Sequence, residues 1–207
     1  MSLTTSFDAD VRSLALPVAA MTLVVVASNI LVQHPFPYWG LQDYLTWGAF
    51  TYPVSFLVTD LTNRRYGVGI ARKLVGVGFV IAIGLSFALA TPRIALASGT
   101  AYLVGQLLDV TVFNRLRRQT WWRAPLVGSL VGSALDTALF FSIAFAGIPE
   151  MSVEIPFLGH HPLPLWQSLA LSDFAVKVVI ALLALLPYGA LMSVILPMEK
   201  VAPQPAR

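Results

Sequence analysis

The sequence has no cysteine and few charged residues, and both shortages limit what the protein can be. Without cysteine there are no disulfides, no thiolate metal sites and no thiol nucleophile. Charged residues make up 11% of the 207 residues and hydrophobic residues 57%, whereas a typical soluble domain has about 25% charged residues. Together with a mean hydropathy of +0.77, these values exclude an ordinary soluble domain.

Motifs for well-known enzyme chemistries are also missing. The sequence contains no P-loop, no HExxH, no GxGxxG and no recognisable Ser/His/Asp order. His160 and His161 are adjacent, but no third ligand stands at metal-binding spacing. We therefore expect no catalytic residues, no metal site and no cofactor.

Apolar stretches long enough to cross a bilayer recur along the chain. A membrane helix needs about 20 residues, so six spans use about 120 residues and leave short connections. We predict an all-α polytopic membrane protein with six transmembrane helices in one integral membrane domain, residues 1–207. The longest connection, 148–168, contains four prolines and is expected to form an irregular cap. The spans are expected at about 14–32, 44–61, 74–90, 94–113, 124–147 and 169–196.

The positive charges indicate the orientation of these spans. Of the 13 Lys and Arg residues, only Arg93 falls on the side opposite the others, and Lys177 lies inside a span. Because cytoplasmic loops carry the excess of Lys and Arg, both termini are expected in the cytoplasm. The net charge of +3 then reflects topology rather than nucleic-acid binding. The acidic flank of the first apolar run, Asp8 and Asp10, favours a retained helix over a secretory signal.

Ionisable residues inside the spans are the first functional candidates, because a charge at the bilayer centre costs at least about 2.5 kcal/mol. Four aspartates against one lysine leave an excess of acid, which must be protonated, solvated or matched by the donors of a ligand. These residues, with two polar companions, are Asp60, Asp109, Asp136, Asp173, Lys177, Asn29 and Gln106.

Glycines at intervals of four place two aspartates inside the helix bundle. Gly105 precedes Asp109, and Gly128 and Gly132 precede Asp136, on one helical stripe each. Small residues let helices approach closely, either within the monomer or between two copies in a homo-oligomer. Segments 105–113 and 132–140 also share Gly, Leu, Asp and Phe at the same offsets. This match is a trace of an inverted repeat, a chance event, or the result of a shared need for a Gly-x-x-x-Asp face on each helix.

Two further acids have alternative interpretations. Asp173 and Lys177 are four residues apart, the spacing of a structural ion pair on one helix. Alternatively, Lys177 pairs across the bundle with one of the two inward-facing aspartates. Asp60 either pairs with Arg64, also four residues away, or contributes to charge balance.

A proline interrupts the second span. Pro53 cannot donate to the carbonyl of Ala49, so the helix is expected to kink or unwind there. Such breaks are common at transporter binding sites, although a packed proline kink is the alternative. Tyr52 and Phe56 lie one turn apart and are candidates to stack on a flat ligand.

A set of short residue blocks from the first span to the sixth is characteristic, and the most specific is the central block, 105–117. The others are 28–29, 31–33, 47–50, 59–62, 66–67, 93–98, 121–122, 136–137, 140–141, Asp173 and Lys177. In these blocks the sequence resembles the bacterial queuosine precursor transporters of the VUT family.

The resemblance implies an inner-membrane importer of 7-deazaguanine bases for the queuosine of tRNA. The substrate would be 7-cyano-7-deazaguanine, with the 7-aminomethyl form as a second candidate. A guanine-like edge presents N–H and NH₂ donors that a buried carboxylate accepts, and its ring stacks on aromatic side chains. The expected substrate-binding residues are Asn29, Tyr52, Phe56, Gln106, Asp109 and Asp136, with Asp60, Asp173 and Lys177 for gating or charge balance.

Other functions fit the same residues. An importer of another vitamin-like heterocycle, or the substrate-capture subunit of a larger transporter, would have a similar set of polar groups. An intramembrane enzyme and a structural or assembly protein are alternatives from other classes. The energy source also stays open between proton coupling, passive equilibration and an energising partner.

Overall fold

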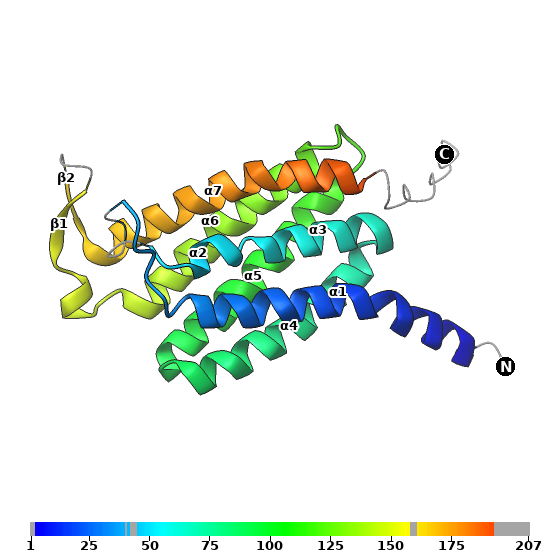
Figure 1. The fold of residues 1–207 in the computed structure, drawn as a ribbon, viewed down its shortest axis with the longest axis horizontal. Coiled ribbons are helices and arrows are strands. Elements are labelled where there is room, and N and C mark those ends of the chain that lie inside the picture. Colours follow the sequence, from blue (N-terminus) through cyan, green and yellow to red (C-terminus); the bar gives the residue numbers. More distant parts are fainter. Residues whose placement is uncertain (1–2, 40, 42–44, 158–160, 193–207) are drawn as a thin grey trace, which may run out of the picture.

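The computed structural model describes residues 3–39, 41, 45–157 and 161–192, which form a bundle of helices with a β-hairpin at one end (Figure 1). A 3₁₀ turn, η1 (Pro149–Met151), precedes the two strands, β1 (Glu154–Phe157) and β2 (His161–Pro164). The helices are α1 (Leu3–Leu31), α2 (Gly48–Thr51), α3 (Val54–Tyr66), α4 (Val68–Leu89), α5 (Pro92–Leu116), α6 (Arg123–Phe145) and α7 (Leu165–Leu191).

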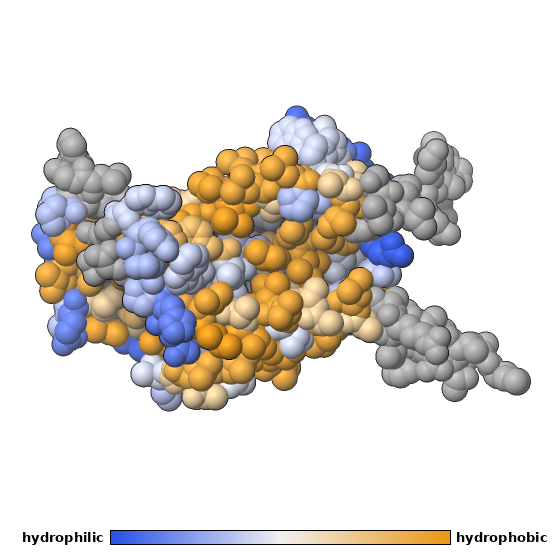
Figure 2. All heavy atoms as spheres, in the orientation of Figure 1, coloured by the Kyte–Doolittle hydropathy of each residue, from blue (hydrophilic) through white to orange (hydrophobic). Residues whose placement is uncertain are grey.

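Five of the described helices are long and apolar enough to cross a membrane: α1 over Leu14–Leu31, and α4, α5, α6 and α7 over their whole lengths. Apolar side chains cover the middle of the molecule in Figure 2, while hydrophilic side chains gather towards its two ends. This distribution is that of a membrane protein, whose apolar belt faces lipid and whose ends face water. The prediction of an all-α membrane protein is confirmed, apart from the hairpin.

The span expected at 44–61 consists of two helices, α2 and α3. The break at Tyr52 and Pro53 confirms the predicted interruption, since proline has no N–H to continue the helical ladder. Residue 44 lies outside the described residues, as do residues 193–196 of the last expected span. α3 ends only at Tyr66, and Gly67 alone separates it from α4. The expected connection 62–73 is therefore largely helical, and Gly67 makes the turn with a φ of 87° that favours glycine.

The expectation of an irregular cap at 148–168 was wrong, because part of this segment forms the hairpin of β1 and β2. Pro156 stands opposite Pro162 in the pairing. Two prolines can face each other at a position of the ladder where neither residue donates a hydrogen bond. The proline content that suggested irregular structure is thus compatible with a two-stranded ribbon.

Helices α5 and α6 cross at two glycines. A Cβ atom on Gly105 would lie 3.0 Å from the carbonyl oxygen of Gly132, and one on Gly132 would lie 2.9 Å from the carbonyl oxygen of Gly105. The glycine face therefore packs within the monomer. Of the two predicted alternatives, packing inside one chain or between two copies, the structure shows the first. At the same crossing Gly105 faces Cβ of Asp136, and Gly132 faces Cβ of Asp109. Because the helices are antiparallel, these aspartates lie on opposite sides of the crossing.

Candidate functional site

A cavity of about 440 Å³ lies among the helices, at the end of the bundle that carries the hairpin. Gln33 and Ala90 line it and are exposed, so the cavity reaches the surface of the protein. Its volume falls within the range of about 300–1,000 Å³ that is common for small-molecule sites. Its polar lining consists of Ser28, Asn29, Gln33, Thr46, Tyr52, Ser98, Tyr102, Asp136, Asp173 and Lys177.

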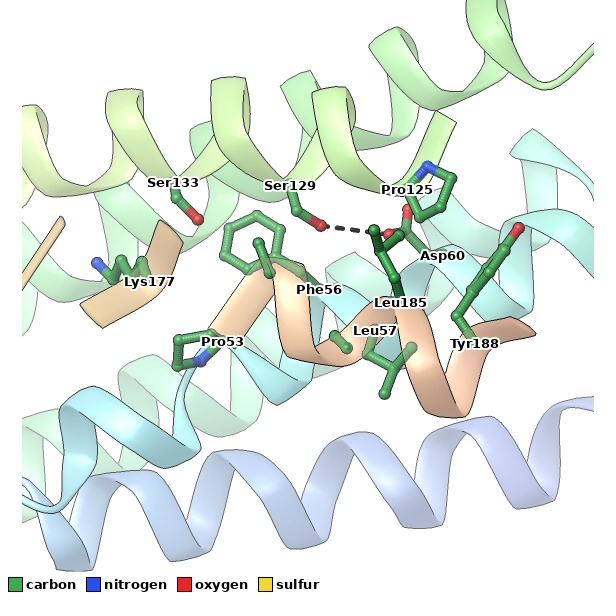
Figure 3. Close-up of a pocket in the computed structure, with 12 residues that line it drawn as sticks. Pro53, Phe56, Leu57, Asp60, Pro125, Ser129, Ser133, Lys177, Leu185 and Tyr188 are labelled. Carbon is green, nitrogen blue, oxygen red and sulfur yellow. Dashed lines mark hydrogen bonds between the residues drawn. The ribbon is translucent and has the colours of Figure 1, made fainter. Parts of the chain in front are cut away.

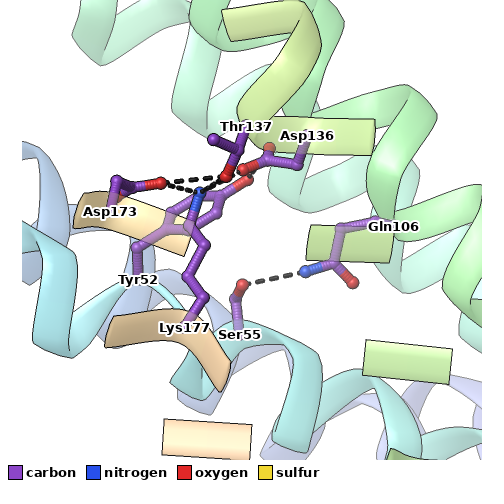
Figure 4. A network of polar contacts seen from close by, with 7 residues as sticks. All are labelled: Tyr52, Ser55, Gln106, Asp136, Thr137, Asp173 and Lys177. Atoms are coloured by element: carbon purple, nitrogen blue, oxygen red, sulfur yellow. Dashed lines mark hydrogen bonds and ion pairs between the residues drawn. The ribbon is translucent and has the colours of Figure 1, made fainter. Parts of the chain in front are cut away.

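Lys177 on α7 joins two aspartates in the wall of this cavity (Figure 4). Its Nζ lies 2.7 Å from Oδ2 of Asp136 on α6 and 2.6 Å from Oδ2 of Asp173 on its own helix. It also donates to Oγ1 of Thr137 at 2.9 Å. Both interpretations of Lys177 are therefore correct, because it pairs along its helix and across the bundle at once.

Tyr52 completes this cluster from the break between α2 and α3. Its hydroxyl donates to Oδ1 of Asp136 at 2.8 Å, and Nζ of Lys177 lies 5.2 Å from the centre of its ring. A cation near an aromatic face is stabilised by the ring quadrupole. The predicted helix break thus has a specific consequence, since it places the Tyr52 side chain beside the buried ion pair.

Asp173 is the carboxylate of the cluster that is most open to a ligand. Its side chain is 18% exposed, compared with 5% for Asp136. Within the described part of the chain its contacts with Lys177 and Thr137 both use Oδ2. Asp136, in contrast, uses one oxygen for Tyr52 and the other for Lys177. With Asp136, Asp173 and Lys177 all ionised, the three groups carry a net charge of −1.

Aromatic rings and the amides of Asn29 and Gln33 provide the rest of a site for a flat polar molecule. Phe140, Phe141 and Phe145 on α6 line the cavity, as does Tyr102 on α5. Asn29 also lines it, and its Oδ1 accepts a hydrogen bond from Ser86 at 3.1 Å. Aromatic walls that surround a few polar groups are the usual composition of a small-molecule site.

Gln106 and Phe56, two of the expected substrate-binding residues, do not line this cavity. Gln106 is fully buried; its Oε1 accepts from Thr59 at 2.7 Å and its Nε2 donates to Ser55 at 2.8 Å. Both ends of the amide are thus used inside the protein, on the far side of Ser55 from the ion pair in Figure 4. Phe56 meets Tyr52 edge to face, with ring planes at 83°, so the two rings leave no parallel slot for a ligand.

Asp109 and Asp60 also lie away from the cavity lining. The prediction that Asp109 faces other helices is confirmed, since it is fully buried, but it lies beyond the α5–α6 crossing, against Gly128. Asp60 accepts a hydrogen bond from Ser129 at 3.3 Å. Arg64, the partner of Asp60 in one of its two interpretations, donates to the carbonyl of Arg117 at 3.2 Å. These two aspartates form a second polar cluster.

The sequence-based hypothesis missed Tyr102 and the phenylalanines of α6 as cavity residues. Tyr102 follows Ser98 by four residues, and Phe140 follows Asp136 by four, so each shares a helical face with a polar lining residue. A search one helical turn beyond Ser98 and Asp136 would have found Tyr102 and Phe140. Phe141 and Phe145 lie one turn apart on α6 in the same way.

Long apolar helices around a polar cavity, with a buried ion pair in its wall, define a polytopic membrane protein of the transporter class. The pattern of the putative vitamin uptake transporter family matches residues 46–90 and 84–192. The chain belongs to this family, whose members are transporters and not enzymes.

Three relatives have more specific names. The queuosine precursor transporter of Escherichia coli (strain K12) is 38% identical over 196 residues, which cover 84% of each chain. A probable queuosine precursor transporter of Haemophilus influenzae is 38% identical over 205 residues, covering 84% of this chain and 83% of the relative. Another from Bacillus subtilis (strain 168) is 29% identical, covering 79% and 77%. No solved structure is significantly similar to this chain.

Proposed function

We propose that this chain imports queuosine precursors and that 7-cyano-7-deazaguanine binds in the 440 Å³ cavity. The names of the relatives from Escherichia coli and Haemophilus influenzae support the substrate. The observation that carries the proposal is the pair of carboxylates held by Lys177 in the wall of an aromatic-lined membrane cavity. A 7-deazaguanine has the complementary features, a flat ring with adjacent N–H and NH₂ donors.

Asp173 is the residue we assign to the guanine-like edge. Its contacts in the described part of the chain use Oδ2, which leaves Oδ1 to accept from the substrate. Asp136 then positions Lys177 and Tyr52 instead of reading the base directly. This assignment exchanges the roles that the sequence suggested for Asp136 and Asp173, and it replaces Phe56 with Tyr102 and the α6 phenylalanines as the stacking surface.

The proposal includes the topology of the chain as one integral membrane domain in the inner membrane. The α2–α3 segment, broken at Pro53, adds one span to the five long apolar helices and makes six in all. Both termini are then cytoplasmic. Arg64 and Arg117 meet at the end away from the hairpin, where partial burial and the guanidinium groups of Arg118 and Arg64 lower the pKa of Arg117. A concentration of positive charge at one end supports a cytoplasmic assignment for it. The cavity then opens to the outside.

Queuosine in tRNA is the readout that tests the proposal. Cells that can neither make nor import the precursor would express this chain and receive a low concentration of 7-cyano-7-deazaguanine. Queuosine should appear with the chain and not with the empty vector. Its absence, with the protein present in the membrane, would overturn the proposed substrate.

The Asp173→Asn variant tests the site itself. A hydrogen bond to a charged group contributes about 1.5–3 kcal/mol, so initial uptake at low substrate should fall by about 10-fold or more. Glu154→Gln is the matched control, because Glu154 is exposed on β1 and away from the cavity. Wild-type uptake by Asp173→Asn at equal membrane abundance would remove Asp173 from the site.

A further inference from the structure

The second polar cluster is a pair of buried carboxyl groups. Asp60 on α3 is 1% exposed and Asp109 on α5 is fully buried. The two side chains are close enough to share a hydrogen bond. In the described part of the chain, Oδ1 of Asp60 and both carboxyl oxygens of Asp109 have no hydrogen-bond donor. Only Oδ2 of Asp60 has one, the hydroxyl of Ser129.

No described cation neutralises this pair. Asp109 and Tyr188 are the titratable groups that face Asp60 from α5 and α7, and α6 contributes the uncharged Ser129. Lys177 is already paired with two other aspartates, and Arg64 donates to a backbone carbonyl. The described residues of α1 and α4 add no charged partner to either carboxyl group.

Two adjacent carboxylates buried without a cation cannot both be ionised. A proton on one of them supplies the missing donor and removes one of the two charges. Oδ1 of Asp109 lies against α6, 2.5 Å from the position that a Cβ on Gly128 would take, so this side of the oxygen has no space for a metal cation. The pair therefore suits a proton better than Na⁺.

A second, small cavity is lined by Asp60 of this pair and by Lys177 of the substrate cavity. This cavity of about 10 Å³, the size needed for one water, lies between α3, α6 and α7. Asp60 and Tyr188 line it at one end and Lys177 at the other. Figure 3 shows Ser129 and Ser133 along α6 between Asp60 and Lys177. Lys177 also lines the large cavity, so it belongs to both.

We propose that Asp60 and Asp109 form the proton-binding site of this transporter, so that import of the base is coupled to inward movement of a proton. The proton forms an O–H bond with one carboxylate oxygen on the outward-open side. It leaves that oxygen to water on the cytoplasmic side after the base has crossed. The inference rests on the proposed import function, which it extends by an energy source.

Purified full-length chain in proteoliposomes, with radiolabelled 7-cyano-7-deazaguanine, separates the two proposals. Counterflow without any gradient measures binding and exchange of the base. Accumulation driven by a pH gradient, alkaline inside, measures coupling. For one proton per neutral base, a gradient of one pH unit supports accumulation of up to about 10-fold. A Na⁺ gradient at equal pH is the parallel arm, and it should have no effect.

Asp109→Asn is the test variant and Asp60→Asn the second, each checked for monodispersity. We expect at least one of them to retain counterflow within about 3-fold of wild type while its accumulation falls to the level without a gradient. Glu154→Gln should keep both activities. Accumulation by both aspartate variants as in wild type would overturn the assignment of the pair, and so would loss of counterflow in both.

Measurements on the wild-type protein test the coupling and the import function separately. Counterflow without a response to the pH gradient, or with a response to Na⁺ instead, would overturn proton coupling and leave the import function standing. Absence of counterflow by wild-type protein would overturn the import function.

Discussion

Replacing Lys177 with methionine should destabilise the protein severely. Methionine keeps much of the apolar volume but removes the cation that lies 2.7 Å from Asp136 and 2.6 Å from Asp173. The net charge of the cluster would change from −1 to −2 at a site where Lys177 is 4% exposed. Removing one partner of a buried ion pair costs about 3–5 kcal/mol. For a chain of this size each kcal/mol shifts the melting temperature by about 2–4 °C, so we expect a decrease of about 6–20 °C.

Thermal unfolding of the detergent-solubilised protein, followed by size-exclusion chromatography, measures this decrease. Lys73→Met is the matched control, since Lys73 is exposed near the start of α4, and it should shift the melting temperature by about 2 °C or less. The double variant Asp173→Asn with Lys177→Met returns the cluster to a charge of −1. It should therefore recover at least half of the lost stability.

The reasoning would be refuted if Lys177→Met and Lys73→Met had the same melting temperature. The aspartates would then be neutral in the folded protein, and Lys177 would not hold an ionised pair. Equal losses in the single variant and the double variant would also contradict it, because the cost would then come from packing rather than from charge.

Two further predictions concern the contacts of α5 with α6. Gly105→Ala should lower the free energy of unfolding by about 1–3 kcal/mol, because its Cβ would meet the Gly132 carbonyl oxygen at 3.0 Å. Gly84→Ala is the control on α4, where no atom lies within 4 Å of the new Cβ. It should raise the free energy of unfolding by about 0.5–1 kcal/mol. Thermal unfolding distinguishes these opposite signs. Arg93→Gln should speed amide hydrogen exchange in the last turn of α6, since Arg93 donates to the carbonyl of Ala146 at 2.6 Å; unchanged exchange there would show that the contact has no stabilising effect.

Helical periodicity was sufficient to predict which residues face inwards. The glycine stripes placed Asp109 and Asp136 inside the bundle, and both are buried. Pro53 likewise predicted the break between α2 and α3. These features are local, because they depend on the angle of 100° per residue and on the missing N–H of proline. The sequence alone therefore contains them.

The depth of each residue along the bundle was not predictable in the same way. Asp109 and Gln106 share an inward face with Tyr102, yet only Tyr102 lines the large cavity. Which turn of α5 meets the cavity depends on how far each neighbouring helix is shifted along its axis. That shift is determined by contacts such as those between Gly105 and Gly132, which periodicity within one helix does not specify.

The repeated Gly-x-x-x-Asp segments gain a physical meaning from this crossing. Each glycine accepts the close approach of the other's backbone, and each aspartate follows its glycine by one helical turn. Because α5 and α6 are antiparallel, the same local pattern places Asp136 in the large cavity and Asp109 in the second polar cluster. The match between the segments thus reflects a shared packing requirement, whether or not they descend from a repeat.

The same crossing explains how the two sites can communicate. The close-packed α5–α6 pair supplies one aspartate to each site, and its two prolines, Pro92 and Pro125, stand in the first turn of each helix. The partner residues come from α3 and α7. Asp60 lies on α3, which begins directly after the break at Pro53, and Lys177 lies on α7, which includes Pro187. Prolines weaken the helical ladder and permit bending. We therefore expect α3 and α7 to move against a rigid α5–α6 pair, so that protonation of Asp109 on one side of the crossing changes the position of Lys177 on the other.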